Sequence, residues 1–83
     1  MKIEGVICGY HPHLPRYAVR TDHGYTVVDV EDGEVSIHDV VFGALEDHGQ
    51  VVLTNRTTGE DVEVCVEAVH ASREAAEALL RSR

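Results

Sequence analysis

Histidines are the residues in this sequence whose type and spacing most directly suggest chemistry. Among the six histidines, His11 and His13 flank a proline, and an extended His-x-His segment can present two imidazoles to one metal ion. A zinc site needs a third or fourth ligand, which Cys8, His23 or His48 would supply only if their segments meet at one end of the fold. The simpler interpretation, which the sequence favours, is that these histidines are solvated loop residues.

Two cysteines, Cys8 and Cys65, fall in segments where polar and apolar residues alternate. The alternation places both thiols on faces that also carry carboxylates, Glu4 beside the first and Glu63 and Glu67 beside the second. The two cysteines can form a disulfide if their strands are neighbours, but two reduced thiols fit a cytosolic protein better. Because neighbouring carboxylates raise the pKa of a thiol, neither cysteine is expected to act as a nucleophile.

The sequence lacks the common catalytic motifs. It contains no glycine-rich phosphate loop, no Gly-x-Ser-x-Gly, no His-Glu-x-x-His and no Cys-x-x-Cys. His38 and Asp39 place an imidazole next to a carboxylate in the chain, but adjacent residues of a strand point to opposite faces. We therefore expect a protein that is not an enzyme and that needs no cofactor.

Cations and aromatic rings alternate in one region, at Arg16, Tyr17, Arg20 and Tyr25. Barrels that hold single-stranded nucleic acid use such a combination, because guanidinium groups attract phosphates and rings stack on bases. The chain nevertheless has 15 acidic against 7 basic residues, a net charge of −8, and only 5% aromatic residues. This composition argues against nucleic acid as a partner. The alternative is that Tyr17 packs in the core while the arginines pair with carboxylates.

The remaining hypothesis is a non-catalytic interaction module whose expected ligand is another protein. It rests on the proline-rich loop between Tyr10 and Tyr17, where rigid and aromatic residues cluster, and on an amphipathic C-terminal segment. The candidate binding residues are Tyr10, His11, His13, Arg16, Tyr17, Arg20 and Tyr25. Leu79 and Leu80 lie on the apolar face of the C-terminal segment, where they would close the open end of a barrel or form a homodimer contact.

The segment from Val51 to Val69 organises the elements that must position these residues. From Asp61 onward, apolar and polar residues alternate regularly, which predicts a strand with one buried face. The intervening loop contains Asn55, whose side chain can accept backbone hydrogen bonds, and Gly59, which tolerates a positive φ. These features predict a β-hairpin.

Shorter segments with the same alternation precede this hairpin. The ranges 2–10, 16–21, 25–31 and 34–37 are predicted strands, separated by a proline-rich loop and by two turns that end in Gly24 and Gly33. Residues 39–45 fit either a helical turn or a strand, and we favour a strand. The period changes after Ser72, a good N-cap, so residues 72–82 are predicted to form a helix.

Together these elements predict one small domain over residues 1–83, an antiparallel β-barrel of about six or seven strands with a C-terminal helix. The architecture is OB-like or SH3-like, and the segment from Asp39 to Gly43 resembles the Gly-Asp-x-Val-x-Gly motif of such barrels, with His38 in place of the first glycine. No apolar run is long enough to cross a bilayer, and the N-terminus has no signal-peptide pattern. We therefore expect no membrane association and a cytoplasmic location.

Overall fold

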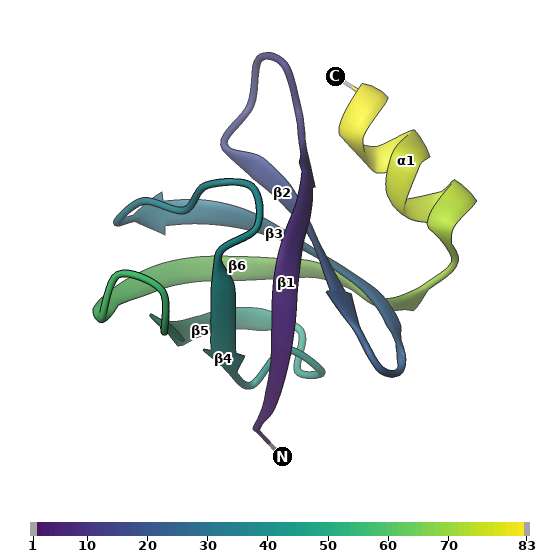
Figure 1. The fold of residues 1–83 in the computed structure, drawn as a ribbon. Coiled ribbons are helices and arrows are strands. Elements are labelled where there is room, and N and C mark those ends of the chain that lie inside the picture. Colours follow the sequence, from purple (N-terminus) through teal and green to yellow (C-terminus); the bar gives the residue numbers. More distant parts are fainter. Residues whose placement is uncertain (1, 83) are drawn as a thin grey trace.

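The computed structural model describes residues 2–82, which form six strands followed by one helix (Figure 1). The elements are β1 (Ile3–Tyr10), β2 (Arg16–Thr21), β3 (Gly24–Asp32), β4 (Val40–Gly43), β5 (Gly49–Asn55), β6 (Glu60–Ala71) and α1 (Arg73–Arg81). The predicted mainly-β fold with a C-terminal helix is confirmed.

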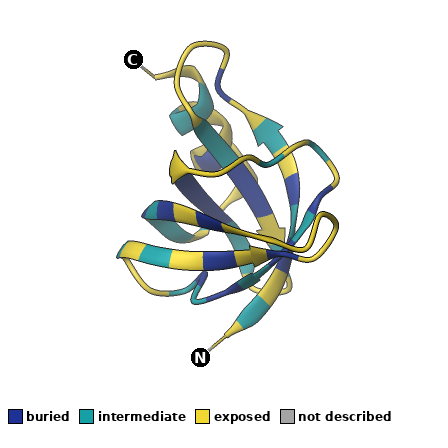
Figure 2. Ribbon diagram, turned by 90° about the vertical axis from the view of Figure 1, so that its left-hand side faces the viewer, coloured by how far each residue is buried: buried dark blue, intermediate teal, exposed yellow. Residues whose placement is uncertain are grey.

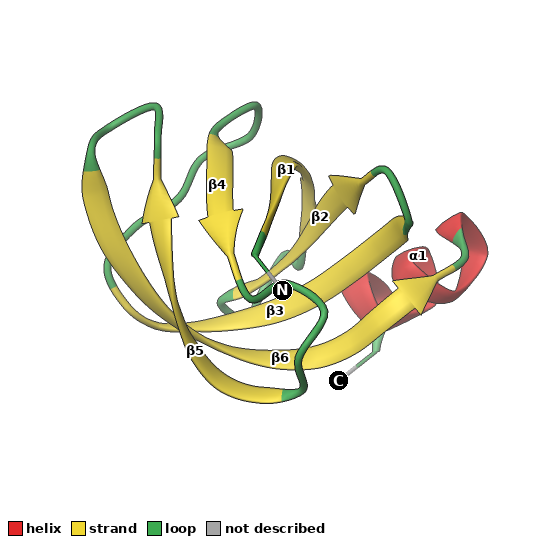
Figure 3. Cartoon of the chain, turned by 90° about the horizontal axis from the view of Figure 1, so that it is seen from below, coloured by secondary structure: helices red, strands yellow, loops and turns green. Residues whose placement is uncertain are grey.

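The strands form a closed antiparallel barrel in the order β1-β2-β3-β6-β5-β4. Two meanders, β1-β2-β3 and β4-β5-β6, join where β3 pairs with β6 and where β1 pairs with β4. Figure 3 shows the curved strands of the barrel with α1 to one side. Closure removes the lateral edges that an open sheet would expose to other chains. It also places β1 beside β2 and β4 and not beside β6, so the two cysteine-bearing strands are not neighbours.

The hairpin between β5 and β6 has the predicted turn chemistry. The Oδ1 atom of Asn55 accepts hydrogen bonds from the backbone N–H groups of Thr57, at 3.0 Å, and Thr58, at 3.3 Å. Gly59 has a φ of +83°, a conformation that favours glycine. Asn55 itself is fully buried, so it fixes both the loop and the end of the barrel core.

The barrel interior is aliphatic. Buried residues lie along the strands, while the connecting loops are largely exposed (Figure 2). The core cluster consists of Ile7, Val19, Val28, Val41, Leu45, Leu53, Val62, Val64 and Val66. Burial of such side chains is the main favourable term in the folding of a chain of this size.

A second apolar layer lies outside the barrel, beneath α1. Ala18 and Val27 are paired residues of β2 and β3 and are buried, although neither belongs to the core cluster. Each alternates with a core residue of its own strand, so both point away from the barrel interior. Ala76, the buried residue of α1, lies over this side, and the helix contacts β2, β3 and β6. The helix therefore covers an outer face of the sheet and not an open end of the barrel.

Local interactions explain where α1 begins and how closely it approaches the sheet. Ser72 caps the helix, because its Oγ accepts a hydrogen bond from the N–H of Ala75 at 3.1 Å. Gly9 allows close approach, since a Cβ atom there would lie 2.9 Å from Cδ1 of Leu80. The predicted helix over 72–82 thus corresponds to Arg73–Arg81 and its two caps. No helix within residues 2–82 is long and apolar enough to cross a membrane.

The prediction of a strand over residues 34–37 is wrong. This segment is irregular, and Val35 and Ile37 pack against the barrel core from outside the strand ladder. The chain turns there, with the N–H of Asp39 bonded to the carbonyl of Ser36 at 3.0 Å and with His38 at a φ of +79°. The side chain of Asp39 stabilises the turn by accepting from the N–H of Ser36 and from Nδ2 of Asn55, each at 2.9 Å.

The residues of the motif from Asp39 to Gly43 each have a structural role. The favoured strand over 39–45 is present in its central part as β4, Val40–Gly43, and Val41 points into the core. Gly43 packs closely on β5, since a Cβ atom there would lie 2.7 Å from Cδ2 of Leu53. His38 occupies a left-handed conformation at the position where the motif has glycine.

Candidate functional site

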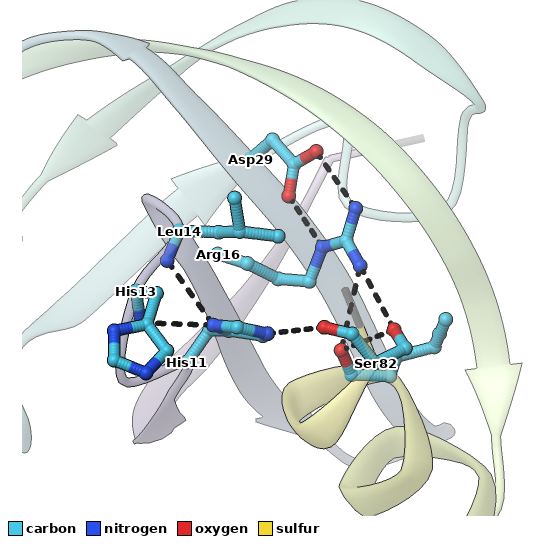
Figure 4. A network of polar contacts seen from close by, with 7 residues as sticks. His11, His13, Leu14, Arg16, Asp29 and Ser82 are labelled. Atoms are coloured by element: carbon cyan, nitrogen blue, oxygen red, sulfur yellow. Dashed lines mark hydrogen bonds and ion pairs between the residues drawn. The ribbon is translucent and has the colours of Figure 1, made fainter.

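The hairpin that joins β1 and β2 holds the C-terminal end of α1 through a network of polar contacts (Figure 4). His11 is buried, and its Nδ1 atom accepts from the backbone N–H groups of His13, at 3.0 Å, and Leu14, at 3.1 Å. Since Nδ1 is an acceptor, the ring proton is on Nε2, which donates to the backbone carbonyl of Ser82. One imidazole thus shapes the proline-rich loop and ties it to the helix.

Arg16 makes the second connection to the helix end. Its Nη1 atom donates to the carbonyl of Leu79 and to Oγ of Ser82, both at 3.4 Å. Its Nε and Nη2 atoms donate to the two carboxylate oxygens of Asp29, its partner on β3, at 2.7 and 3.2 Å. This bidentate bond raises the pKa of the guanidinium further and fixes its position. A cation held at the last carbonyl groups of a helix is also favourable to the helix dipole.

These contacts define the geometry at the predicted metal-ligand pair. The rings of His11 and His13 lie edge to face with their centroids 6.2 Å apart. Both ring nitrogens of His11 already have hydrogen-bond partners, so a metal ion there would have to replace one of these bonds. Within residues 2–82, no three histidine, cysteine or acidic side chains gather as a potential metal site.

A cleft of about 650 Å³ lies between α1 and the outer face of β1, β2 and β3. This volume is within the usual range for ligand sites. We call it the helix cleft, and its lining residues are Cys8, Gly9, Tyr10, Ala18, Arg20, Tyr25, Ile37, Arg73, Ala76, Glu77 and Leu80. Its floor includes Gly9 and Ala18, small residues of β1 and β2 that let the helix pack closely on the sheet. Its position therefore depends on the contacts of His11 and Arg16 that hold the far end of α1.

The helix cleft contains the Cys8 thiol, at the bulge where the pairing of β1 with β2 shifts register. Partial burial of the sulfur raises the pKa of Cys8, and the positive charges of Arg20 and Arg73 act in the opposite direction. Burial outweighs the two cations. The pKa of Cys8 is raised, as the sequence predicted, but the cause is burial and not the carboxylate of Glu4.

Cys65 has a different environment on β6. It lies across from Asp29, and the side chain of Glu67 raises the pKa of the thiol by accepting its hydrogen bond. Of the two acidic neighbours predicted from the sequence, Glu67 acts on this cysteine; the other carboxylates that raise its pKa are Glu31 and Asp29, and not Glu63. Both cysteines are free.

The structure divides the seven predicted binding residues among several environments. Tyr10, Arg20 and Tyr25 line the helix cleft, and Arg20 pairs with Tyr25 across β2 and β3. Arg16 and His11 hold the helix end instead. Tyr17 packs against the barrel core, as the alternative interpretation of the sequence expected. His13 is exposed in the loop.

Sequence reasoning missed the contribution of α1 to this site. Arg73, Glu77 and Leu80 occupy one helical face and form a wall of the cleft, whereas Leu79 offers its carbonyl to Arg16. A helical period of three to four residues joins Arg73, Glu77 and Leu80, but only the packed structure shows which sheet face they meet.

A second groove of about 440 Å³ lies near the start of β1 and the β2–β3 turn. Its charged lining residues have both signs, with Lys2 and Arg20 near Glu4 and Asp22. These charges balance, whereas the helix cleft carries two arginines against one glutamate, so the helix cleft is the better candidate site. Comparison of the chain with protein-family models, curated proteins and solved structures gives no match. The assignment of function therefore depends on the geometry described above.

Proposed function

We propose that this chain is a non-catalytic binding module that holds a segment of a partner protein in the helix cleft. One observation carries the proposal. The cleft brings two tyrosine rings, Tyr10 and Tyr25, together with arginine side chains and the aliphatic Leu80. Tyrosine and arginine are enriched at protein interfaces, because they combine large contact area with hydrogen bonds.

The surface beside the cleft favours a protein as the ligand. Tyr10 is 61% exposed and Leu14 is 38% exposed, and both belong to the hairpin that borders the cleft. Large apolar side chains exposed next to a cleft extend the available contact area beyond the cleft itself. A polypeptide can cover both regions, whereas a small molecule fills only the cleft.

The chemistry of the cleft is consistent with binding and not with catalysis. Its one strong nucleophile is the Cys8 thiol, whose pKa is raised by burial, and a protonated thiol is a poor nucleophile. The backbone at Arg20 and Tyr25 is fixed by the pairing of β2 with β3 in the closed barrel. A preformed backbone lowers the entropic cost of binding.

This proposal is tested by selecting binders from a random library of displayed 12-residue peptides. The affinities of the selected peptides are then measured. The two cysteines provide matched blocking variants. An N-ethylmaleimide adduct on Cys8, in a Cys65→Ser background, should abolish binding, because it occupies the cleft. The same adduct on Cys65, in a Cys8→Ser background, should leave the affinity within about twofold.

Circular dichroism shows whether each adduct keeps the fold. If the Cys8 adduct unfolds the protein, Tyr10→Ser is the second test, since Tyr10 is mostly exposed and its truncation leaves the core intact. Selected peptides that bind equally well to the Cys8 adduct and to Tyr10→Ser would overturn the proposal. Failure to select any peptide with Kd below about 100 μM, which corresponds to roughly −5.5 kcal/mol, would also overturn it.

A further inference from the structure

Some arginines of this acidic chain form ion pairs with carboxylates and others do not. Arg16 pairs with Asp29, and Arg56 pairs with Glu4 at 3.0 Å while its guanidinium lies 4.2 Å above the ring of Phe42. By contrast, within residues 2–82 neither Arg20 nor Arg73 forms an ion pair with a carboxylate. Both of these arginines line the helix cleft. Among residues 2–82, Lys2 and Arg81 also lack an ion pair with a carboxylate, but neither lines the helix cleft. What distinguishes Arg20 and Arg73 is that they share one cleft.

The two arginines come from different elements but line the same cleft. Arg20 is on β2, across from Tyr25, and Arg73 is the first residue of α1. Both line the helix cleft together with Cys8, which lies at the bulge of β1, and both positive charges act to lower the pKa of that thiol. Glu77 is the one acidic residue that lines the cleft, and it lies one helical turn beyond Arg73.

We propose that the helix cleft recognises an anionic side chain of the partner segment, which binds between Arg20 and Arg73 while neighbouring residues pack on the tyrosine rings. This inference rests on the proposed protein-binding function. A guanidinium binds a carboxylate or a phosphate through paired hydrogen bonds. The partner residue is therefore an aspartate, a glutamate or a phosphorylated side chain, and the rest of this acidic chain repels anionic segments that do not reach the cleft.

The test uses the peptides selected for the previous experiment, with fluorescent labels for anisotropy measurements. Neutralising variants Arg20→Gln and Arg73→Gln should each weaken binding about tenfold or more, because each removes a charge-assisted contact. Arg81→Gln is the matched control. It makes the same charge change on α1, but Arg81 does not line the cleft, so its affinity should remain within about twofold.

Changes in the peptide identify the source of the negative charge. Replacing the critical acidic residue by glutamine should weaken binding about tenfold, and replacing it by phosphoserine should preserve or strengthen binding. Tighter binding of phosphoserine than of glutamate indicates a phosphorylated partner, and the opposite order indicates a carboxylate.

Two results would overturn the inference. The first is selection of peptides without acidic residues that bind Arg20→Gln and Arg73→Gln as tightly as the unmodified chain, which would leave a binding module with a different preference. The second is binding of single-stranded dT12 at low salt more tightly than the selected peptides and through the same two arginines. That result would assign the cleft to nucleic acid. Failure to select any peptide, in contrast, counts against the proposed function itself.

Discussion

Removal of the His11 side chain gives the most informative single perturbation of the structure. His11 is only 5% exposed, and its ring makes three hydrogen bonds: Nδ1 accepts two from the backbone of the proline-rich loop, and Nε2 donates one to the carbonyl of Ser82, the C-cap of α1. In His11→Ala all three bonds are lost. Each contributes about 1 kcal/mol on average, so we expect the free energy of unfolding to fall by about 2–4 kcal/mol.

This loss is large for a chain of 83 residues. Domains of this size have free energies of unfolding of roughly 4–12 kcal/mol. With a urea dependence of about 1 kcal/mol per molar, the midpoint of unfolding should decrease by roughly 2 M or more. Urea titration followed by circular dichroism measures the change. Hydrogen exchange should show faster exchange in α1 than in the barrel strands, because the loop anchors the helix end.

His13→Ala is the control, since it removes an exposed ring from the same loop but keeps the backbone N–H that donates to His11. We expect this variant to lose less than about 0.5 kcal/mol, as exposed substitutions usually do. The reasoning would be refuted by a His11→Ala variant within 0.5 kcal/mol of the unmodified chain. Equal losses for both variants would refute it as well.

Three further predictions concern the backbone and the second cysteine. His38→Gly should raise the free energy of unfolding by about 0.5–1 kcal/mol in urea titration, because His38 has a φ of +79° and glycine removes that strain; a less stable variant would contradict this explanation. Gly5→Ala should lower the free energy of unfolding by about 1–3 kcal/mol, since the added methyl group would lie 2.5 Å from Cγ1 of Val19. An unchanged unfolding midpoint would contradict this prediction and show that the strand pair adapts. The pKa of Cys65 is raised mainly by its hydrogen bond to Glu67, so Glu67→Gln should lower that pKa and accelerate iodoacetamide alkylation at pH 8 in protein whose other cysteine is serine. An unchanged alkylation rate would count against that cause.

The strands and turns could be predicted because their determinants are local. Alternation of side chains along residues 61–69 requires one buried face, and Asn55 and Gly59 specify the hairpin loop by themselves. The same reliance on local alternation produced the wrong prediction of a strand over residues 34–37. Val35 and Ile37 alternate with polar residues as in a strand, but the side chain of Asp39 stabilises a turn that keeps them outside the ladder.

The helix cleft could not be predicted, because it depends on contacts between distant parts of the chain. Tyr10, Arg20 and Tyr25 were candidate residues from their types alone, but Arg73 becomes relevant only when α1 packs on the outer face of β2 and β3. The sequence also does not reveal that Arg16 is committed to Asp29. Pairing between elements decides which arginines remain available for a ligand.

Mapping of ligand-induced NMR shifts on the backbone amides tests the central claim most directly, namely that ligands bind between α1 and the outer face of the barrel. Titration of the ¹⁵N-labelled chain with the tightest selected peptide should shift amides in the ranges 8–10, 18–25 and 73–80, which contain most of the cleft lining. Amides of the β5–β6 hairpin, on strands that do not line the cleft, should remain in place. Shifts confined to that hairpin, with the cleft amides unchanged, would contradict the account.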